Sequence, residues 1–131
     1  HQRDAHQDFM HCITKEVIPS KGVVHCFTGS ISELYDYLDQ GLYIGITGWL
    51  CDPKRGKDLE KTIPKIPIEK LMIETDSPYL LPKNIKTKNR RNEPYFLPEI
   101  FNKIYDLRSE SKEVLQYQIY ENSMNFFNLN E

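Results

Sequence analysis

The sequence contains LMIETDSP at residues 71–78, an apolar run that ends just before the carboxylate of Asp76. A second stretch, GVVHCFTG at residues 22–29, has the same form, with His25 at the end of its apolar run. Short runs rich in Val, Ile, Leu and Met are typical of buried strands. Ligands at the carboxyl ends of successive parallel strands are the way in which a β/α barrel builds a metal site. The two stretches therefore predict a metal site at one edge of a parallel sheet.

Around these stretches the hydrophobic pattern alternates between helices and strands. Ser30 and Glu33 have the spacing of a capping box, and Gly41 stands where a glycine commonly follows a helix. In chain order the pattern predicts a helix over 4–18, a strand over 21–27, a helix over 30–41, a strand over 42–47, a helix over 56–62 and a strand over 70–75. Repeated strand–helix units of this length predict an α/β fold with a parallel sheet.

After the third strand the pattern changes to a long polar loop over 82–94, followed by two helices. Apolar residues recur at helical spacing over 97–104 and again over 114–126, with Ser109 as the expected N-cap of the last helix. The aromatic residues of these two helices fall at the same spacing, so we expect them in the core. No linker divides the chain, and residues 1–131 are expected to form a single partial domain.

The length of the chain limits what this pattern can build. A β/α barrel usually needs about 250 residues, whereas this chain has 131. We therefore expect the carboxyl-terminal half of a TIM-type (β/α)8 barrel, with about three parallel strands and surrounding helices. Three strands cannot close a barrel, and the sheet would keep two unpaired edges. The chain is therefore expected to need a complementary polypeptide, either the missing amino-terminal half or another chain.

The composition of the chain bears on its affinity for nucleic acid, the state of its thiols and its location. The formal net charge is −2, from 17 basic and 19 acidic residues, so any affinity for nucleic acid must be local. The cysteines Cys12, Cys26 and Cys51 are odd in number and form no Cys-x-x-Cys pair, which favours free thiols in a reducing compartment. No apolar run approaches the roughly 20 residues of a membrane span, and no signal-type segment opens the chain. We expect a cytoplasmic protein without a membrane segment.

Three residues are candidate metal ligands: His1, His25 and Asp76, which are far apart in sequence. Parallel strands bring their carboxyl ends to one edge, where imidazole nitrogens and a carboxylate suit a divalent ion that keeps positions open for water and substrate. Asp76 would also position the attacking water or accept its proton. Other interpretations stay open: an isolated strand histidine is often structural, Asp before Ser-Pro often forms a turn, and a terminal histidine can be a tag remnant.

Several stretches in register resemble the TatD family of metal-dependent deoxyribonucleases. They are HQRDA at 1–5, VHCFTG at 24–29, YIGITG at 43–48, IETDSPYL at 73–80 and RNEP at 91–94. The resemblance extends from the first residue to the last helix. It implies an eight-stranded β/α barrel akin to the amidohydrolases, with Mg²⁺-dependent hydrolysis of DNA that is typically exonucleolytic from the 3′ end.

The same resemblance assigns roles to the candidate ligands. His1, His25 and Asp76 match the family's ligands after the fifth, sixth and eighth strands. One or two ions are implied, Mg²⁺ first, with Mn²⁺ or Zn²⁺ as alternatives. The family's amino-terminal His-x-His pair and bridging Glu lie on earlier strands that this chain does not contain. Whether this chain catalyses a reaction by itself is therefore open at this point.

A basic loop follows the candidate ligand Asp76. Residues 82–92 contain no acid and five cations, namely Lys83, Lys86, Lys88, Arg90 and Arg91. Such a loop can contact a DNA backbone, although charge runs are often only solvated. Arg91 is a candidate phosphate clamp with Glu93 as its support, or the two form an ordinary surface ion pair. Trp49 could stack on a base or pack under a loop.

The sequence is compatible with three functions. The first is a Mg²⁺-dependent deoxyribonuclease acting on single-stranded DNA or DNA ends. The second keeps the metal site but cleaves an ester or amide, for example the aminoacyl group of acylated tRNA. The third is a non-catalytic fragment or interaction module. Among the remaining residues, we expect His6 and His11 to face solvent and Cys26 to serve as packing.

Overall fold

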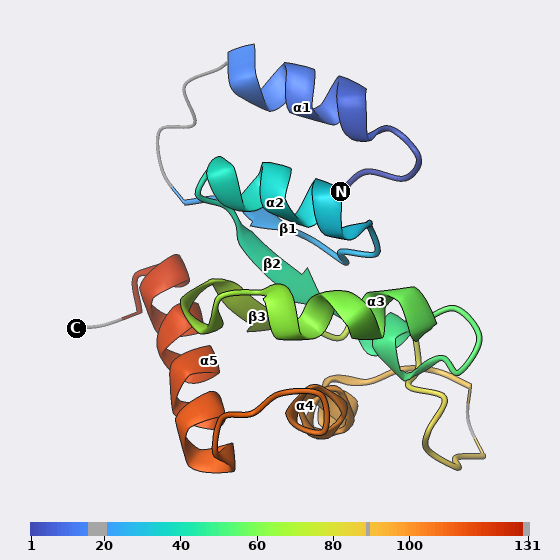
Figure 1. Ribbon diagram of the computed structural model, residues 1–131. Helices are drawn as coiled ribbons and strands as arrows, with labels where there is room; N and C mark the ends of the chain where they lie inside the picture. The colour runs from blue at the N-terminus through green and yellow to red at the C-terminus, as the bar shows by residue number, and fades with distance from the viewer. Residues whose placement is uncertain (16–20, 89, 130–131) are drawn as a thin grey trace.

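The structure is a computed structural model that describes residues 1–15, 21–88 and 90–129 (Figure 1). Its helices are α1 (His6–Lys15), α2 (Ile31–Asp39), α3 (Lys57–Thr62), α4 (Leu97–Tyr105) and α5 (Lys112–Phe127). Its strands are β1 (Val23–Val24), β2 (Tyr43–Ile46) and β3 (Leu71–Ile73). Short 3-10 helices occupy Gly48–Cys51, Ile63–Lys65, Ile68–Lys70 and Pro94–Phe96.

The three strands form one parallel sheet in the order β1-β2-β3. Val24 pairs with Ile44, and Ile46 pairs with Ile73, so the carboxyl ends of all three strands reach the same edge. Figure 1 shows α1 outside α2 at one end of the molecule and α4 and α5 at the other, where both contact β3. The predicted α/β fold with three parallel strands and surrounding helices is confirmed.

The outer strands are shorter than the apolar runs that predicted them. The run over 21–27 forms a strand only at Val23–Val24, because the chain turns at His25 and Cys26 has a φ of 51°. Hydrogen bonding to β2 continues past this turn, since Phe27 N donates to Gly45 O over 2.9 Å. The polar residues therefore lie on turns and loops just beyond the strand ends.

The helix boundaries test the capping predictions. The capping box of α2 is confirmed: Ser30 Oγ accepts from Glu33 N over 3.3 Å, and the Glu33 carboxylate accepts from Ser30 N over 2.6 Å. Helix α1 begins at His6 rather than at residue 4, because Asp4 has a left-handed φ of 53°. The predicted end of this helix at residue 18 lies outside the described residues.

The predicted N-cap of α5 is wrong. Ser111, not Ser109, caps the helix, and its Oγ accepts from the N–H of Val114 over 3.3 Å. The guanidinium of Arg108 binds the carbonyl of Ile63 over 2.9 Å, which holds the chain against the Ile63–Lys65 turn. The helix begins only after this anchored segment.

One apolar core lies between the sheet and the helices. Ile44 and Ile46 of β2 are fully buried, and Leu34 of α2, Ile100 of α4 and Leu115 of α5 are equally inaccessible. Full burial of such side chains stabilises the fold by about 1.5–3 kcal/mol each before conformational entropy is counted. The central strand is therefore the part of the sheet most completely enclosed.

The expectation that the aromatic residues of the last two helices lie in the core is wrong for Tyr105 of α4 and for three aromatic residues of α5 (Tyr117, Tyr120 and Phe127). Tyr117 and Tyr120 are exposed, because Leu115 and Ile119, four residues apart, occupy the positions that face the core. Asn122 on the same helix is buried and donates from Nδ2 to the carbonyls of Ile68 and Leu71, which fastens α5 to the start of β3. Within the three described segments, no helix combines the length and apolar character of a membrane span.

Candidate active site

His25 and Asp76 meet at the carboxyl edge of the sheet. His25 follows β1 directly and Asp76 comes three residues after β3, and Nε2 of His25 lies 3.3 Å from Oδ1 of Asp76. The ring of His1 lies 5.7 Å from that of His25 between centroids, and its Nδ1 is 3.3 Å from the His25 carbonyl oxygen. All three residues line one pocket of about 580 Å³. The structure thus brings the three candidate ligands together, while their role as ligands stays a prediction.

The donor atoms can be compared with what a metal ion requires. Among residues 1–15, 21–88 and 90–129, no three His, Cys, Asp or Glu side chains stand in a geometry ready to hold an ion. His25 and Asp76 nevertheless offer an imidazole nitrogen and a carboxylate oxygen side by side, a donor set that suits a divalent ion with open positions. The residue types therefore fit such an ion, with this pair at the centre of its site.

Glu74 orients the imidazole of His25. One carboxylate oxygen, Oε2, accepts from Nδ1 of His25 over 2.7 Å, and the other, Oε1, accepts from the backbone N–H of Cys26 over 2.6 Å. Because a carboxylate only accepts, Nδ1 donates this bond, and Nε2 is the ring nitrogen that faces Asp76. A carboxylate behind a ligating histidine is the usual device that fixes the orientation of such a ring. Sequence reasoning missed Glu74, although its place two positions before Asp76 was a usable signal.

Gly45 provides the space that Glu74 occupies. A Cβ atom at this position would lie 2.5 Å from Oε1 of Glu74 and 3.2 Å from the carbonyl oxygen of Val24. Gly45 belongs to β2, the central strand, so the Glu74 side chain crosses over it to reach the end of β1. Any larger residue here would displace the carboxylate from His25.

The backbone of the site is held in sparsely populated conformations. Cys26 and Asp76 have φ values of 51° and 58°, in the left-handed region that residues with a side chain rarely adopt. Each costs on the order of 1–3 kcal/mol unless the surroundings impose it. Buried Asn92 imposes part of it, because its Nδ2 donates to the carbonyls of Thr75 and Tyr79 over 2.8 and 2.6 Å. Sequence reasoning did not single out Asn92.

The turn after β2 brings two backbone segments very close together. A Cβ atom at Gly48 would lie 2.0 Å from the carbonyl oxygen of Leu80, so no residue with a side chain fits at this position. Thr47 is fully buried, and its hydroxyl lies 3.2 Å from Sγ of Cys26. Cys26 is buried as expected, and this burial raises the pKa of its thiol. It therefore stays protonated near neutral pH and acts as packing beside the site.

Trp49 and Arg55 line the same pocket and form a cluster with buried Asp52. Trp49 donates from Nε1 to the carbonyl of Arg55 over 3.2 Å, and the Arg55 guanidinium lies 4.1 Å from the centre of the indole. The side chain of Asp52 is only 2% exposed and accepts from Nε of Arg55 over 2.6 Å and pairs with Nζ of Lys83 over 2.7 Å. Trp49 thus packs against a cation, and its predicted stacking on a base stays a prediction.

The charges around Asp52 keep it ionised. The Lys83 ammonium, then the Arg55 guanidinium and the backbone N–H of Lys54, hold the pKa of the Asp52 carboxyl far below its usual value near 3.8. Arg55 was not a candidate from the sequence, although an Asp and an Arg three residues apart are a recognisable pairing signal.

The remaining predicted substrate contacts lie farther from the candidate ligands. Arg90 is exposed and lines an adjacent hollow that also contains Arg55. Arg91 and Glu93 are exposed and do not line the pocket of His25. Their roles in binding substrate stay predictions.

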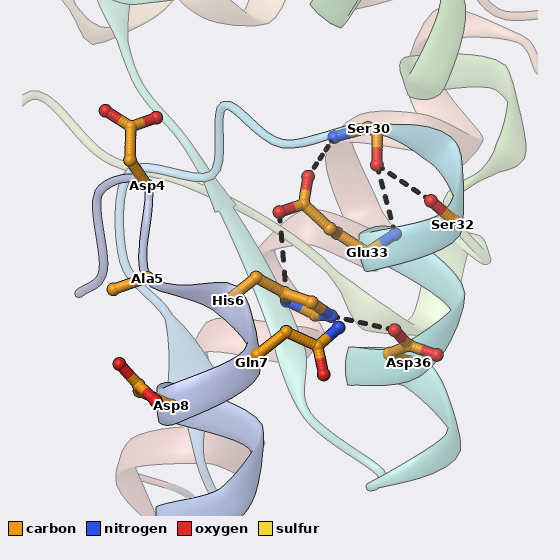
Figure 2. A pocket seen from close by; sticks show the side chains of 9 residues that line it. All are labelled: Asp4, Ala5, His6, Gln7, Asp8, Ser30, Ser32, Glu33 and Asp36. Atoms are coloured by element: carbon orange, nitrogen blue, oxygen red, sulfur yellow. Dashed lines mark hydrogen bonds and ion pairs between the residues drawn. The ribbon is translucent and has the colours of Figure 1, made fainter.

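The expectation that His6 faces solvent is wrong. Its ring is 10% exposed, and its Nδ1 lies 2.9 Å from the hydroxyl of Tyr37. Its Nε2 lies 2.7 Å from Oδ2 of Asp36 (Figure 2). The same Tyr37 hydroxyl accepts from Nε2 of Gln2 over 3.0 Å. These bonds fasten α1 and the segment that carries His1 onto α2.

We expect Gly45→Ala to free the His25 ring. The added methyl group overpacks the site, a change that typically costs about 1–3 kcal/mol, and moves the Glu74 carboxylate off Nδ1. The ¹⁵N shifts of the His25 ring, which report where its proton resides, should then approach those of exposed His11. In a Glu74→Ala background the His25 ring already lacks its partner, and Gly45→Ala should change the ring shifts little further. Unchanged ring shifts in the single variant would contradict the assignment.

Asp52 should make the fold sensitive to acid. Because its folded-state pKa is lowered, its ion pairs stabilise the fold fully above the unfolded pKa near 3.8 and less as the pH falls below that value. Asp52→Asn should therefore lower the urea midpoint at pH 7, with a difference from the wild type that shrinks below about pH 4. Asp58→Asn, which breaks an exposed pair with Lys61, is the control and should have little effect. A constant difference from pH 7 to pH 2 would refute this role.

Comparison with known proteins agrees with this architecture. The family model described as "TatD related DNase" matches residues 1–128. The chain is 46% identical over 133 residues to the "3'-5' ssDNA/RNA exonuclease TatD" of Klebsiella pneumoniae (strain 342), covering 98% of this chain and 50% of that protein. The protein of the same name from Salmonella typhimurium is 45% identical, with 97% and 50% covered. The chain spans about half the length of the curated relatives it matches.

Solved structures agree with the sequence comparison. A TatD family hydrolase of Entamoeba histolytica superposes with a TM-score of 0.84 at 31% identity, over 96% of this chain and 48% of that one. YJJV, a TatD homologue of Escherichia coli k12, gives a TM-score of 0.87 at 26% identity, with the same coverage. The match of the family model over nearly the whole sequence is sufficient: the chain belongs to the family of TatD-related DNases.

Proposed function

We propose that the protein is a metal-dependent nuclease that hydrolyses phosphodiester bonds of DNA, as a 3′-to-5′ exonuclease. The observation that carries the proposal is the contact between Nε2 of His25 and Oδ1 of Asp76, with Glu74 orienting the ring from behind. The names of the relatives, which describe an exonuclease for single-stranded DNA and RNA, support a nucleic-acid substrate.

Each residue of the site has a separate role in hydrolysis. Nε2 of His25 and a carboxylate oxygen of Asp76 would hold one or two divalent ions together with His1, Mg²⁺ in the first place and Mn²⁺ or Zn²⁺ as alternatives. A bound ion of this kind lowers the pKa of a coordinated water and polarises a phosphoryl oxygen. The Asp76 carboxylate orients the attacking water and accepts its proton. Arg3, which lines the same pocket, supplies positive charge toward the phosphate.

Asp76→Asn in the full-length protein should abolish this activity. The amide keeps the shape of the side chain but removes the charge and the proton acceptor, a loss of roughly 10²–10⁴-fold in kcat for a general base. Stepwise shortening of a 5′-labelled single strand, with Mg²⁺ present, provides the measurement. Asp58→Asn, an exposed change away from the site, is the matched control. Normal turnover by Asp76→Asn would refute the assignment, and preferential cleavage of acylated tRNA would replace the nuclease with an ester hydrolase.

The proposal also covers the cellular location of the protein and its association with another chain. Cys12, Cys26 and Cys51 are free thiols, which supports a reducing, cytoplasmic location. In the described chain, β1 and β3 each pair with β2 alone, so each has a free outer edge. We therefore expect the 131-residue chain to associate with a complementary polypeptide or with itself. Analytical ultracentrifugation that finds only a folded, soluble monomer would contradict this expectation.

A further inference from the structure

Arg55 lies where two hollows of the surface join. One is the pocket that contains His25 and Asp76. The other, of about 830 Å³, is formed by the basic loop after Leu80 and contains Lys86 and Lys88. Arg55 and Leu80 line both hollows. A chain of phosphates leaving the candidate metal ligands toward the basic loop would therefore pass Arg55.

The guanidinium of Arg55 is held in a fixed position, yet part of it remains available to bind a ligand. Its Nε binds buried Asp52 and its plane lies against the indole of Trp49, yet the side chain remains 47% exposed. The contact with Asp52 engages Nε alone. The two terminal nitrogens make no hydrogen bond to the described residues. An Arg fork presented in this way is preorganised for a phosphate and loses little side-chain entropy on binding.

The cluster around Asp52 retains positive charge. A single carboxylate pairs with both Arg55 and Lys83, so one charge of the two cations is uncompensated. No acidic residue lines the basic hollow, where Lys86, Lys88 and Arg90 add three further cations. Because the pKa of Asp52 is lowered, this arrangement persists throughout the neutral pH range.

The lining of the basic hollow favours a single strand over a duplex. Apolar side chains of Leu80, Leu81 and Ile85 stand among its cations. A single strand exposes both phosphates and base faces, and it can satisfy both kinds of surface at once. A duplex exposes its phosphates but stacks its bases inside, and would leave the apolar wall without a partner.

We propose that Arg55 binds the phosphate next to the one that lies at His25 and Asp76, and that the single strand continues into the basic hollow along Lys86 and Lys88. This inference rests on the proposed function and adds a binding subsite to it: Arg55 and the basic hollow hold several nucleotides of the strand upstream of the cleaved bond. Trp49 and Asp52 are positioning residues in this arrangement, because they hold Arg55 and leave its terminal nitrogens open to the strand.

The experiment measures how the effect of Arg55→Gln depends on substrate length in the full-length protein. For an octanucleotide, KM should rise about tenfold with kcat nearly unchanged, the loss of roughly one charge-assisted hydrogen bond. For bis-p-nitrophenyl phosphate, which has no second phosphate, the rise should be much smaller. Arg55→Lys should recover only part of the affinity, since an ammonium lacks the planar fork. Lys65→Gln, an exposed change before β3 at the amino edge of the sheet, is the control.

Binding is measured separately from cleavage, by the fluorescence anisotropy of a labelled octanucleotide. Arg55→Gln and Lys86→Gln should each weaken binding and reduce its salt dependence by about 0.7 in the slope of log K against log salt. The second variant is exposed, so a folding defect cannot account for both results. Equal effects on all lengths, tighter binding of a duplex, or no effect of either variant would overturn the inference. Arg55-dependent binding without any hydrolysis would instead refute the nuclease and leave the inference standing.

Discussion

The carboxylate of Glu74 joins the ends of two strands that do not touch each other in the sheet. β1 and β3 both pair with β2 and lie on opposite sides of it. Glu74 extends from the end of β3, over Gly45, to the imidazole of His25 and the backbone N–H of Cys26 beyond β1. The direction in which His25 presents Nε2, and with it the contact to Asp76, depends on this one side chain.

Three carboxylates near the pocket have the same chemistry but different surroundings. The surroundings determine the role of each one. Glu74 is occupied on both oxygens by donors from the β1 end, so it acts as a support. Asp76 remains partly exposed next to Nε2 of His25, which leaves it open to an ion or to water. Asp52 is buried between two cations and serves to hold Arg55 in place. The surroundings thus distinguish a support, a candidate ligand and an anchor.

Much of the fold could be predicted because the signals for it are local. The apolar runs before His25 and Asp76 predicted parallel strands, and the spacing of Ser30 and Glu33 predicted a capping box that the structure contains. The prediction was wrong where a local signal competed with a distant contact. His6 was expected in solvent, but Tyr37, 31 positions later, provides a partner for its ring.

The sequence by itself determined the order of strands and helices, the family to which the chain belongs, and two residues, His25 and Asp76, that could meet at one edge of a sheet. Those conclusions rest on periodicity and motifs, which short segments carry independently of the rest of the chain. The tertiary structure alone decided which nitrogen of His25 faces Asp76, because the partner of the other nitrogen, Glu74, is 49 positions away. It also decided that Arg55 reaches the pocket, because that depends on the burial of Asp52 and on a loop that brings Lys83 to the same carboxylate. Such contacts arise only when distant segments pack, and no local pattern records them.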